Sequence, residues 1–179
     1  ANMLAAAAKL GAKTAFIGMI GDDFFGNFLK ETLNNCGIET KGLIQTSKAA
    51  TTLAFVHLFD NGDRSFSFYR NPGADTMLTK SLVDFSLIDQ CKIFHFGALD
   101  LTNEPTRSTT FAAICYAKDK GKLVSFDPNL RLSLWGSPDL AKKYLTLGLE
   151  QSDVVKLSEI ELSFLLDTED YDAGTEKIV

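Results

Sequence analysis

The feature that most limits how this chain can fold is a regular alternation of two kinds of segment. Short runs rich in β-branched and aromatic residues predict strands at Thr14–Ile20, Glu39–Ile44, Lys92–Phe96, Lys122–Phe126 and Asp153–Leu157. Longer stretches with apolar residues three and four positions apart predict helices at 23–36, 105–120, 138–151 and 159–166. Strands that alternate with helices are joined by right-handed crossovers. We therefore predict an α/β fold, a Rossmann-like and mainly parallel sheet with helices on both faces.

One segment interrupts this alternation. Two strand-like runs, Thr51–Asp60 and Arg64–Arg70, lie on either side of Asn61-Gly62. Asn-Gly favours a tight type I′ turn, because both turn positions need a positive φ. An isolated two-stranded unit is only marginally stable, so this hairpin must pack on more strands, on a substrate or on a second subunit. We predict a projecting β lid over residues 45–70 and a core formed by 1–44 and 71–179.

Charge and cysteine usage exclude several classes of protein. The net charge is -5 and the pI is about 5.0, whereas nucleic acid or an anionic membrane as the main partner requires a basic face. No apolar run approaches the roughly 20 residues that span a bilayer. Cys36, Cys91 and Cys115 match no zinc spacing, and their odd number argues against a disulfide framework. We therefore predict a cytoplasmic protein with reduced thiols.

Polar residues and glycines collect after four of the predicted strands. They lie in the segments Gly21–Gly26, Gly97–Asp100, Asp127–Arg131 and Lys156–Glu161. Ligands of parallel sheets bind at the carboxyl ends of the strands, so these loops form the candidate site. Each also has a purely structural interpretation: a helix cap at Asp22 or Asp23, a turn at Asp127-Pro128-Asn129, a capping box at Ser158 and Glu161, and surface cations at Arg70 and Arg131.

Two common nucleotide-binding motifs are missing. No G-x-G-x-x-G occurs, which disfavours a dinucleotide-binding site. Gly21 and Gly26 have P-loop spacing, but Asn27-Phe28 stands where Lys-Ser/Thr is required. His57 and His95 lie in predicted strands with no nucleophile pattern around them, so we interpret both as structural histidines.

Considered together, these segments resemble a known family. Ala1-Asn2, Leu10-Gly11, Ile17–Asp23 and Gly26 resemble the first signature of the ribokinase-like (PfkB) carbohydrate kinases. Later segments follow in the family's order, namely Phe68-Tyr69-Arg70-Asn71-Pro72-Gly73-Ala74-Asp75, Phe94–Gly97, Asp127-Pro128-Asn129-Leu130-Arg131 and Lys156–Glu161. The FYRNPGAD-like and DPNLR-like segments look most like the fructokinases of this family. The resemblance runs along essentially the whole chain and implies a ribokinase-like fold.

The resemblance also implies an activity and a set of residues. The activity is transfer of the ATP γ-phosphate to a sugar hydroxyl, with Mg²⁺ and, as a further candidate, a monovalent cation. By position, the sugar is bound by Asn2, Phe68, Arg70 and Arg131, with Phe68 and Arg70 on a closing lid. The nucleotide phosphates are bound by Asn129, Arg131 and Lys156. Glu161 acts on the metal through water, although Ser158 replaces the Asn of the family's N-x-x-E motif. The lids of two copies are expected to pair in a homodimer.

The family's catalytic base has no counterpart in this sequence. In the family it is the Asp of a Gly-Ala-Gly-Asp segment at a helix N-terminus, and no such segment occurs in residues 1–179. The Gly-Gly pair that precedes the matching Asn2 and the first strand are also missing, and a further helix is expected to begin at Ile178-Val179. We therefore expect a partial chain that is inactive alone, with the base in a missing C-terminal part.

Three other functions remain open from the sequence. The first alternative is a related kinase that acts on 2-keto-3-deoxygluconate or ribose. The spacing of the site residues does not distinguish these sugars from fructose, because each sugar offers hydroxyls to similar side chains. A non-catalytic sugar- or nucleotide-binding module that has lost its base is a second alternative. A plain α/β interaction domain is a third, and it requires every polar loop to be only a cap or a turn.

Overall fold

The computed structural model describes residues 1–176, so the helix predicted to begin at Ile178 lies outside the described residues. The chain divides into two compact units, Ala1–Asp84 and Phe85–Val179. Each unit is described by itself below, and the division into a core of 1–44 and 71–179 with a lid of 45–70 stays a prediction. In the part of the chain that the structure describes, no helix is both long and apolar enough to cross a membrane.

Unit one begins with two parallel strand pairs and two helices. Its first elements are α1 (Asn2–Lys9), β1 (Thr14–Ala15), β2 (Gly18–Gly21), α2 (Phe24–Asn35), β3 (Ile38–Glu39) and β4 (Leu43–Thr46). β1 pairs with β3 and β2 pairs with β4, both in parallel. Each of the two strands predicted here is therefore interrupted. A turn separates β3 from β4, because Leu43 donates its backbone N–H to the carbonyl of Thr40 at 2.9 Å. Their partners β1 and β2 are separated at the corresponding point.

The β2–β4 strand pair has apolar contacts on both faces. Met19 and Ile20 are consecutive in β2, so their side chains point to opposite faces. Ile20 packs with Leu33 of α2 and with side chains of α1, whereas Met19 packs with Ala74 and Leu78. Ala74 begins a short 3₁₀ helix, η1 (Ala74–Met77), which is followed by η2 (Lys80–Leu82). The buried strand is thus covered by helices on one side and by the segment after the hairpin on the other.

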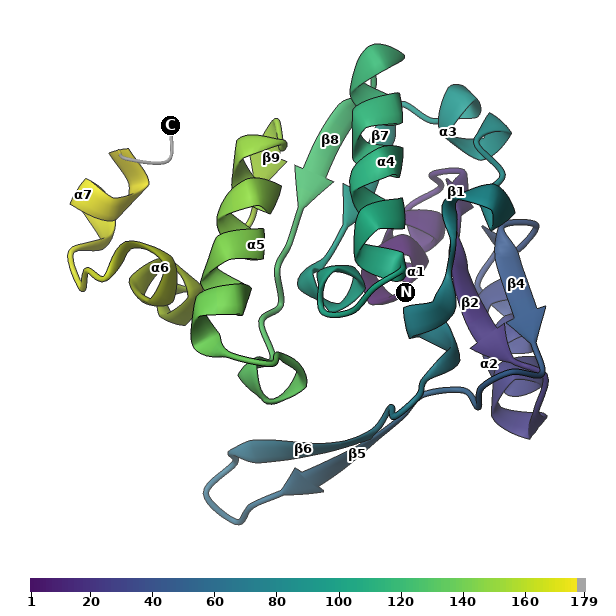
Figure 1. The fold of residues 1–179 in the computed structure, drawn as a ribbon, viewed down its shortest axis with the longest axis horizontal. Helices are drawn as coiled ribbons and strands as arrows, with labels where there is room; N and C mark the ends of the chain where they lie inside the picture. Colours follow the sequence, from purple (N-terminus) through teal and green to yellow (C-terminus); the bar gives the residue numbers. More distant parts are fainter. Residues whose placement is uncertain (177–179) are drawn as a thin grey trace. The chain divides into compact units, whose positions relative to one another are not determined.

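The predicted hairpin is present, but its turn differs from the prediction. Strands β5 (Leu53–Leu58) and β6 (Arg64–Tyr69) pair antiparallel from Leu53–Tyr69 to Leu58–Arg64 and extend away from the rest of unit one (Figure 1). Gly62 has φ 85, but Asn61 does not have a positive φ, so the predicted type I′ turn is wrong. Gly62 instead ends a wider loop closed by the bond from Phe59 N–H to the Asp63 carbonyl at 2.9 Å. The Asn61 side chain accepts the Asp63 N–H at 3.0 Å, which favours this loop.

Unit two carries a three-stranded parallel sheet. Its elements are α3 (Ser86–Gln90), β7 (Ile93–Phe96), η3 (Ala98–Leu101), α4 (Thr106–Asp119), β8 (Leu123–Phe126), η4 (Leu132–Leu134), α5 (Pro138–Glu150), β9 (Val154–Val155), α6 (Glu159–Leu166) and α7 (Tyr171–Glu176). The strand order is β7-β8-β9, and all pairings are parallel. Phe96 and Phe126 stack with ring centroids 4.4 Å apart, and Gly148 lets α5 approach the Phe126 ring. The predicted helices at 105–120, 138–151 and 159–166 are confirmed.

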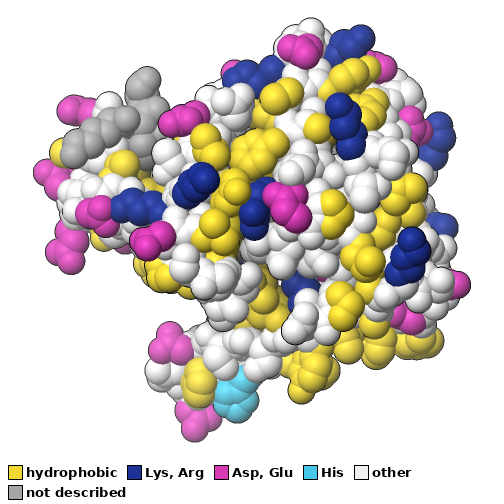
Figure 2. Space-filling model, in the orientation of Figure 1, with side chains coloured by type: hydrophobic (Ala, Val, Ile, Leu, Met, Phe, Trp, Pro, Cys, Tyr) yellow, Lys and Arg dark blue, Asp and Glu magenta, His cyan; other side chains and the backbone are white. Residues whose placement is uncertain are grey.

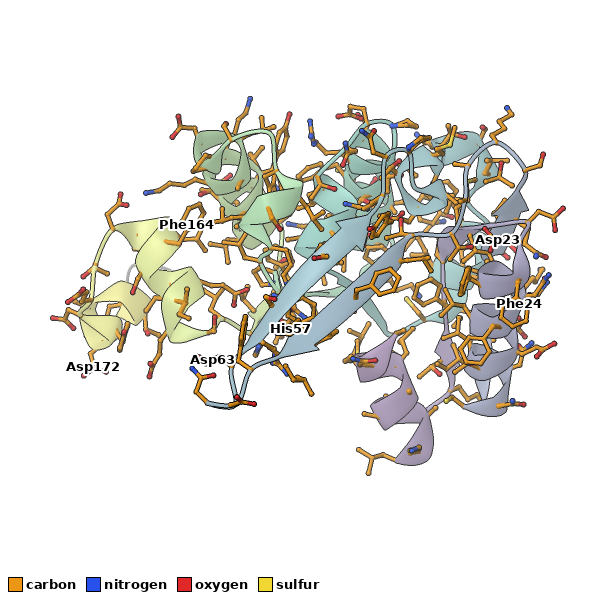
Figure 3. The ribbon with its side chains drawn as sticks, turned by 90° about the horizontal axis from the view of Figure 1, so that it is seen from below. Asp23, Phe24, His57, Asp63, Phe164 and Asp172 are labelled. Carbon is orange, nitrogen blue, oxygen red and sulfur yellow. The ribbon has the colours of Figure 1, made fainter. Side chains whose placement is uncertain are left out.

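Asp23, labelled beside Phe24 in Figure 3, joins the start of α2 to the root of the hairpin. Its carboxylate accepts the Gly26 N–H at 2.8 Å, as an N-cap, and also the Thr51 N–H and hydroxyl, both at 2.8 Å. Thr51 in turn accepts the Gly21 N–H at 2.9 Å. These hydrogen bonds, first those from the Thr51 and Gly26 backbone, lower the pKa of Asp23. The prediction of a helix cap at this position is therefore confirmed for Asp23.

Gly26 allows this close approach, and replacing it gives a stability prediction. A Cβ at position 26 would lie 2.1 Å from the Gly21 carbonyl oxygen. Gly26→Ala should therefore lower the free energy of unfolding by more than about 2 kcal/mol, although alanine normally favours a helix. The matched control is Gly136→Ala, whose Cβ would be 3.8 Å from its nearest neighbour. Urea denaturation of the two variants tests this, and equal stabilities would contradict it.

Candidate functional site

The candidate site of unit two lies where its parallel strands end. The Asp127 N–H donates to the carbonyl of Phe96 at 3.3 Å, and the Lys156 N–H donates to the carbonyl of Phe126 at 3.0 Å. The loops that follow β7, β8 and β9 therefore begin side by side. Ala98, in the loop after β7, also donates its N–H to the Pro128 carbonyl at 2.9 Å. The predicted gathering of loops at one sheet edge is confirmed within this unit.

A buried carboxylate joins two of these loops. Glu161 is 5% exposed, and one of its oxygens accepts the Leu130 N–H at 2.7 Å. Its other oxygen accepts the Ser158 N–H at 2.9 Å and the Ser158 hydroxyl at 2.8 Å. The Ser158 hydroxyl also accepts the Glu161 N–H at 3.4 Å, which completes a capping box at the start of α6. The capping-box interpretation of Ser158 and Glu161 is confirmed, and the same acid also holds the loop after β8.

The protonation of Glu161 follows from these bonds. Burial by itself raises the pKa of a carboxyl group. At Glu161 this is outweighed by the hydrogen bonds from Ser158 and Leu130, together with the positive charge of Lys156, so the pKa of Glu161 lies below its ordinary value of 4.5. The group is therefore a carboxylate at neutral pH, and it adds a fixed negative charge beneath the two loops.

The loop after β8 exposes the residues that the sequence selects. Asn129 has φ 50, in the left-handed region that Asn adopts more readily than most residues. Its side chain is exposed, whereas the next residue, Leu130, is fixed by Glu161. Arg131 is partly buried and donates from Nη1 to the Leu130 carbonyl at 2.9 Å. The loop thus presents the amide of Asn129 close to the guanidinium of Arg131. The hydrogen bond to the Leu130 carbonyl orients that guanidinium.

Lys156 places a second cation at this edge. Its ammonium lies 3.5 Å from the Asp127 carboxylate, and the Lys156 side chain is 69% exposed. An exposed ion pair of this kind contributes little to stability, about 0–1 kcal/mol. Unit two therefore brings together four of the predicted site residues, Asn129, Arg131, Lys156 and Glu161.

The other predicted site residues, Asn2, Phe68 and Arg70, lie in unit one. Asn2 is the exposed first residue of α1. Phe68 is partly buried on β6, where its ring stacks with Phe66 at a centroid distance of 6.1 Å. Arg70 directly follows β6, and its side chain is only 6% exposed, so its interpretation as a surface cation is wrong. That these residues share one cleft with those of unit two stays a prediction.

Three residues near the hairpin have contacts that the sequence did not reveal. Thr51, Thr52 and Asp75 bond to Asp23 or Arg70 or to each other at the root of the hairpin. Asp75 belongs to the FYRNPGAD-like segment. Its partner Arg70 lies five positions earlier, between β6 and η1, where no helix or strand periodicity relates the two residues. Thr51 and Thr52 precede a strand, where threonine is common because it favours β structure. The threonine pair and the FYRNPGAD-like segment therefore do not predict these hydrogen bonds.

The other histidine, cysteine and acidic side chains of residues 1–176 have mainly structural surroundings. Among the described residues, no group of three His, Cys, Asp or Glu side chains is placed to hold a metal ion. His95 is partly buried, its Nδ1 lies 3.2 Å from the Ser125 hydroxyl, and burial lowers its pKa. His57 lies on the exposed hairpin against Phe59 (Figure 3). The three cysteines are free thiols.

Comparison with known proteins identifies the family. A model described as pfkB family carbohydrate kinase matches residues 1–178. The chain therefore belongs to the pfkB carbohydrate kinases, as its signatures predict.

Individual relatives within the family are fructokinases. The chain is 44% identical to Fructokinase-2 of Solanum lycopersicum over 165 residues, which cover 92% of this chain and 50% of the relative. It is also 44% identical to Fructokinase-2 of Oryza sativa subsp. japonica over 179 residues, 100% of this chain and 52% of the relative. The chain thus spans about half the length of the curated relatives it matches.

Solved structures confirm the predicted ribokinase-like α/β fold. Fructokinase from Xylella fastidiosa superposes with a TM-score of 0.90 at 38% identity, over 99% of this chain and 55% of that one. A structure of the Xylella fastidiosa enzyme with bound ATP gives 0.89 at 38% identity, over 99% of this chain and 56% of that one. Fructokinase from Vibrio cholerae O395 in its fructose, ADP and calcium ion bound form gives 0.90 at 36% identity, over 99% of this chain and 57% of that one.

The bonds of Glu161 predict a pH-dependent stability. Because the pKa of Glu161 is lower in the folded state, its contribution is complete above the ordinary value of 4.5 and is lost as the pH falls through the lowered folded value. Glu161→Gln should destabilise the protein by about 1–3 kcal/mol at neutral pH and lose less stability on acidification. Glu159→Gln, an exposed neighbour in the same helix, is the control. Parallel pH profiles of urea denaturation for wild type and Glu161→Gln would contradict the assignment.

Proposed function

We propose that the complete gene product is an ATP-dependent fructokinase, which transfers the γ-phosphate of ATP to a hydroxyl of fructose. One observation carries this proposal: the adjacent loops after β8 and β9 present Asn129, Arg131 and Lys156 at one sheet edge, fixed from below by Glu161. The identity of 44% to fructokinases along nearly all of the chain supports fructose as the acceptor.

The chemistry of phosphoryl transfer suits these residues. The sugar hydroxyl attacks the γ-phosphorus while the bond to the leaving oxygen of ADP breaks, and the transition state spreads negative charge over the phosphoryl oxygens. Catalysis therefore depends mainly on positioning the two substrates and on neutralising the negative charge of the phosphates. We assign Lys156, Asn129 and Arg131 to the phosphates, with Arg131 also reaching the sugar, because a guanidinium holds oxygen atoms in a fixed geometry. The proton acceptor is expected in a Gly-Ala-Gly-Asp segment beyond residues 1–179.

The metal is assigned to the phosphates rather than to a protein cage. Both oxygens of Glu161 accept hydrogen bonds from Leu130 or Ser158, so direct ligation would cost bonds that hold the loops. Mg²⁺ keeps several waters and binds substrate phosphates readily, which fits an ionised Glu161 acting through water. When bound, the ion would neutralise phosphate charge. A monovalent cation is a further candidate activator, since a Vibrio cholerae fructokinase double-mutant structure contains a potassium ion.

The sugar side of the site is assigned to unit one. In the proposal, Asn2 hydrogen-bonds sugar hydroxyls, and residues 45–70 act as a lid on a core of 1–44 and 71–179. Phe68 lies on the apolar face of the hairpin, and Arg70 lies at its root. A lid that closes over the sugar would exclude water, which would otherwise hydrolyse the γ-phosphate. A cytoplasmic location is proposed with this function, since its three cysteines are free thiols.

Sugar specificity is tested with a panel of acceptors. The complete gene product should phosphorylate fructose with a higher kcat/KM than 2-keto-3-deoxygluconate or ribose, measured by coupled ADP release with Mg²⁺. Residues 1–179 alone should be inactive in the same assay, because no Gly-Ala-Gly-Asp occurs in them. A strong response to another sugar would replace fructose. Sugar binding without turnover by the complete protein would favour the non-catalytic module.

The hairpin predicts a homodimer in which two lids pack together. One of its faces carries apolar side chains in alternate positions, Ala54, Val56, Leu58, Phe66 and Phe68, together with Arg64, which lies opposite Leu58. Val56 is 52% exposed and Leu58 is 72% exposed, and hydrophobic and acidic side chains are visible on the hairpin in Figure 2. Light scattering of the complete gene product should give the mass of two copies, and Val56→Asp should shift it toward one copy. A monomeric wild type would contradict this arrangement.

A further inference from the structure

A single carboxylate joins both ends of the hairpin. Asp75 accepts from Arg70 at 2.7 Å (Nε) and 2.5 Å (Nη2), with both nitrogens directed at Oδ2. Its other oxygen, Oδ1, accepts the hydroxyl of Thr52 in a short hydrogen bond. Thr52 directly precedes β5 and Arg70 directly follows β6. Asp75 therefore connects the point where the chain enters the hairpin with the point where it leaves.

The backbone at this root is built closely around the three side chains. Ala74 donates its N–H to the Ala50 carbonyl at 2.9 Å, and Ala50 and Gly73 form an isolated parallel bridge. A Cβ at Gly73 would lie 2.1 Å from the Thr52 hydroxyl oxygen, 2.6 Å from Asp75 Oδ1 and 2.7 Å from Cγ of Arg70. A glycine is therefore required where the backbone touches all three, and the Thr52–Arg70–Asp75 cluster has little room to rearrange.

Burial distinguishes this ion pair from a surface one. The Arg70 side chain is 6% exposed and that of Asp75 is 34% exposed. Burying a guanidinium removes its favourable hydration, and the attraction of the partner carboxylate often does no more than offset that loss. Such a pair therefore contributes little net stability. The two bonds to one carboxylate instead determine the orientation of Arg70. They fix the plane of its guanidinium and the directions of its other N–H groups.

We propose that Asp75 is a positioning residue for sugar binding, which orients Arg70 and holds both ends of the hairpin in register. This inference rests on the proposed function, in which Arg70 contacts the sugar. Asp75 itself need not touch the substrate. Its effect should therefore appear in the affinity for the sugar and disappear when Arg70 is absent.

The test is a double-mutant cycle in the complete gene product. Asp75→Asn keeps the shape but removes the charge, and it should raise the KM for fructose about tenfold, as expected for the loss of a charge-assisted hydrogen bond. The KM for ATP should change less than about twofold, and kcat less than about threefold. In the Arg70→Ala background, Asp75→Asn should have almost no further effect, because residues that act through one another are not additive. Asp60→Asn, an exposed hairpin acid, is the matched control.

The outcomes separate this inference from the proposed function. A wild type without sugar-dependent ATP turnover would overturn both. An active wild type with equal fructose KM values for Asp75→Asn and Asp60→Asn would overturn the positioning role alone, as would full additivity with Arg70→Ala. If Asp75→Asn does not fold, Thr52→Val removes only the bond at the start of β5. A rise of its fructose KM of about threefold, with the KM for ATP unchanged, would support the role, and an unchanged fructose KM would overturn it.

Discussion

The constraint on which the candidate site depends is the burial of one carboxylate. A charge that is 5% exposed must be satisfied by hydrogen bonds, and Glu161 finds them in two loops that are far apart in the chain. The bonds from Leu130 and Ser158 fix the backbone directly after Asn129 and two positions after Lys156. The residues assigned to phosphate binding are therefore positioned by an acid that need not touch the phosphate.

The same solution recurs at the hairpin. Asp23 holds Thr51 against the start of α2, and Asp75 holds Thr52 and Arg70 against each other. In each place a glycine, Gly26 or Gly73, allows the backbone to approach closer than any side chain would permit. Hydrogen bonds from backbone N–H groups and hydroxyls to carboxylates thus replace the apolar contacts that a two-stranded hairpin is too thin to supply.

Much of the fold follows from periodicity, and less of the site does. The helices and the parallel order were predictable, because buried side chains repeat at the spacing of each element. The interruption of the first two strands was not, since a turn at Thr40–Leu43 leaves the apolar pattern intact. The loop at Asn61 was predicted wrongly because its side chain bonds to Asp63 and changes the preferred turn. The proposed role of Asp75 depends on its contacts with Thr52 and Arg70 at the root of the hairpin, which no local pattern contains, and the common cleft of the two units stays a prediction.

The register of the hairpin has a consequence for how relatives of this protein can diverge. Its strands pair residue for residue from Leu53–Tyr69 to Leu58–Arg64, and side chains alternate between the two faces. Lengthening both strands by two residues leaves every apolar side chain on its original face, whereas a single inserted residue reverses the faces beyond it. Because the carboxylate contacts lie at the root, evolution is free to extend this arm in steps of two without disturbing the sheet that anchors it.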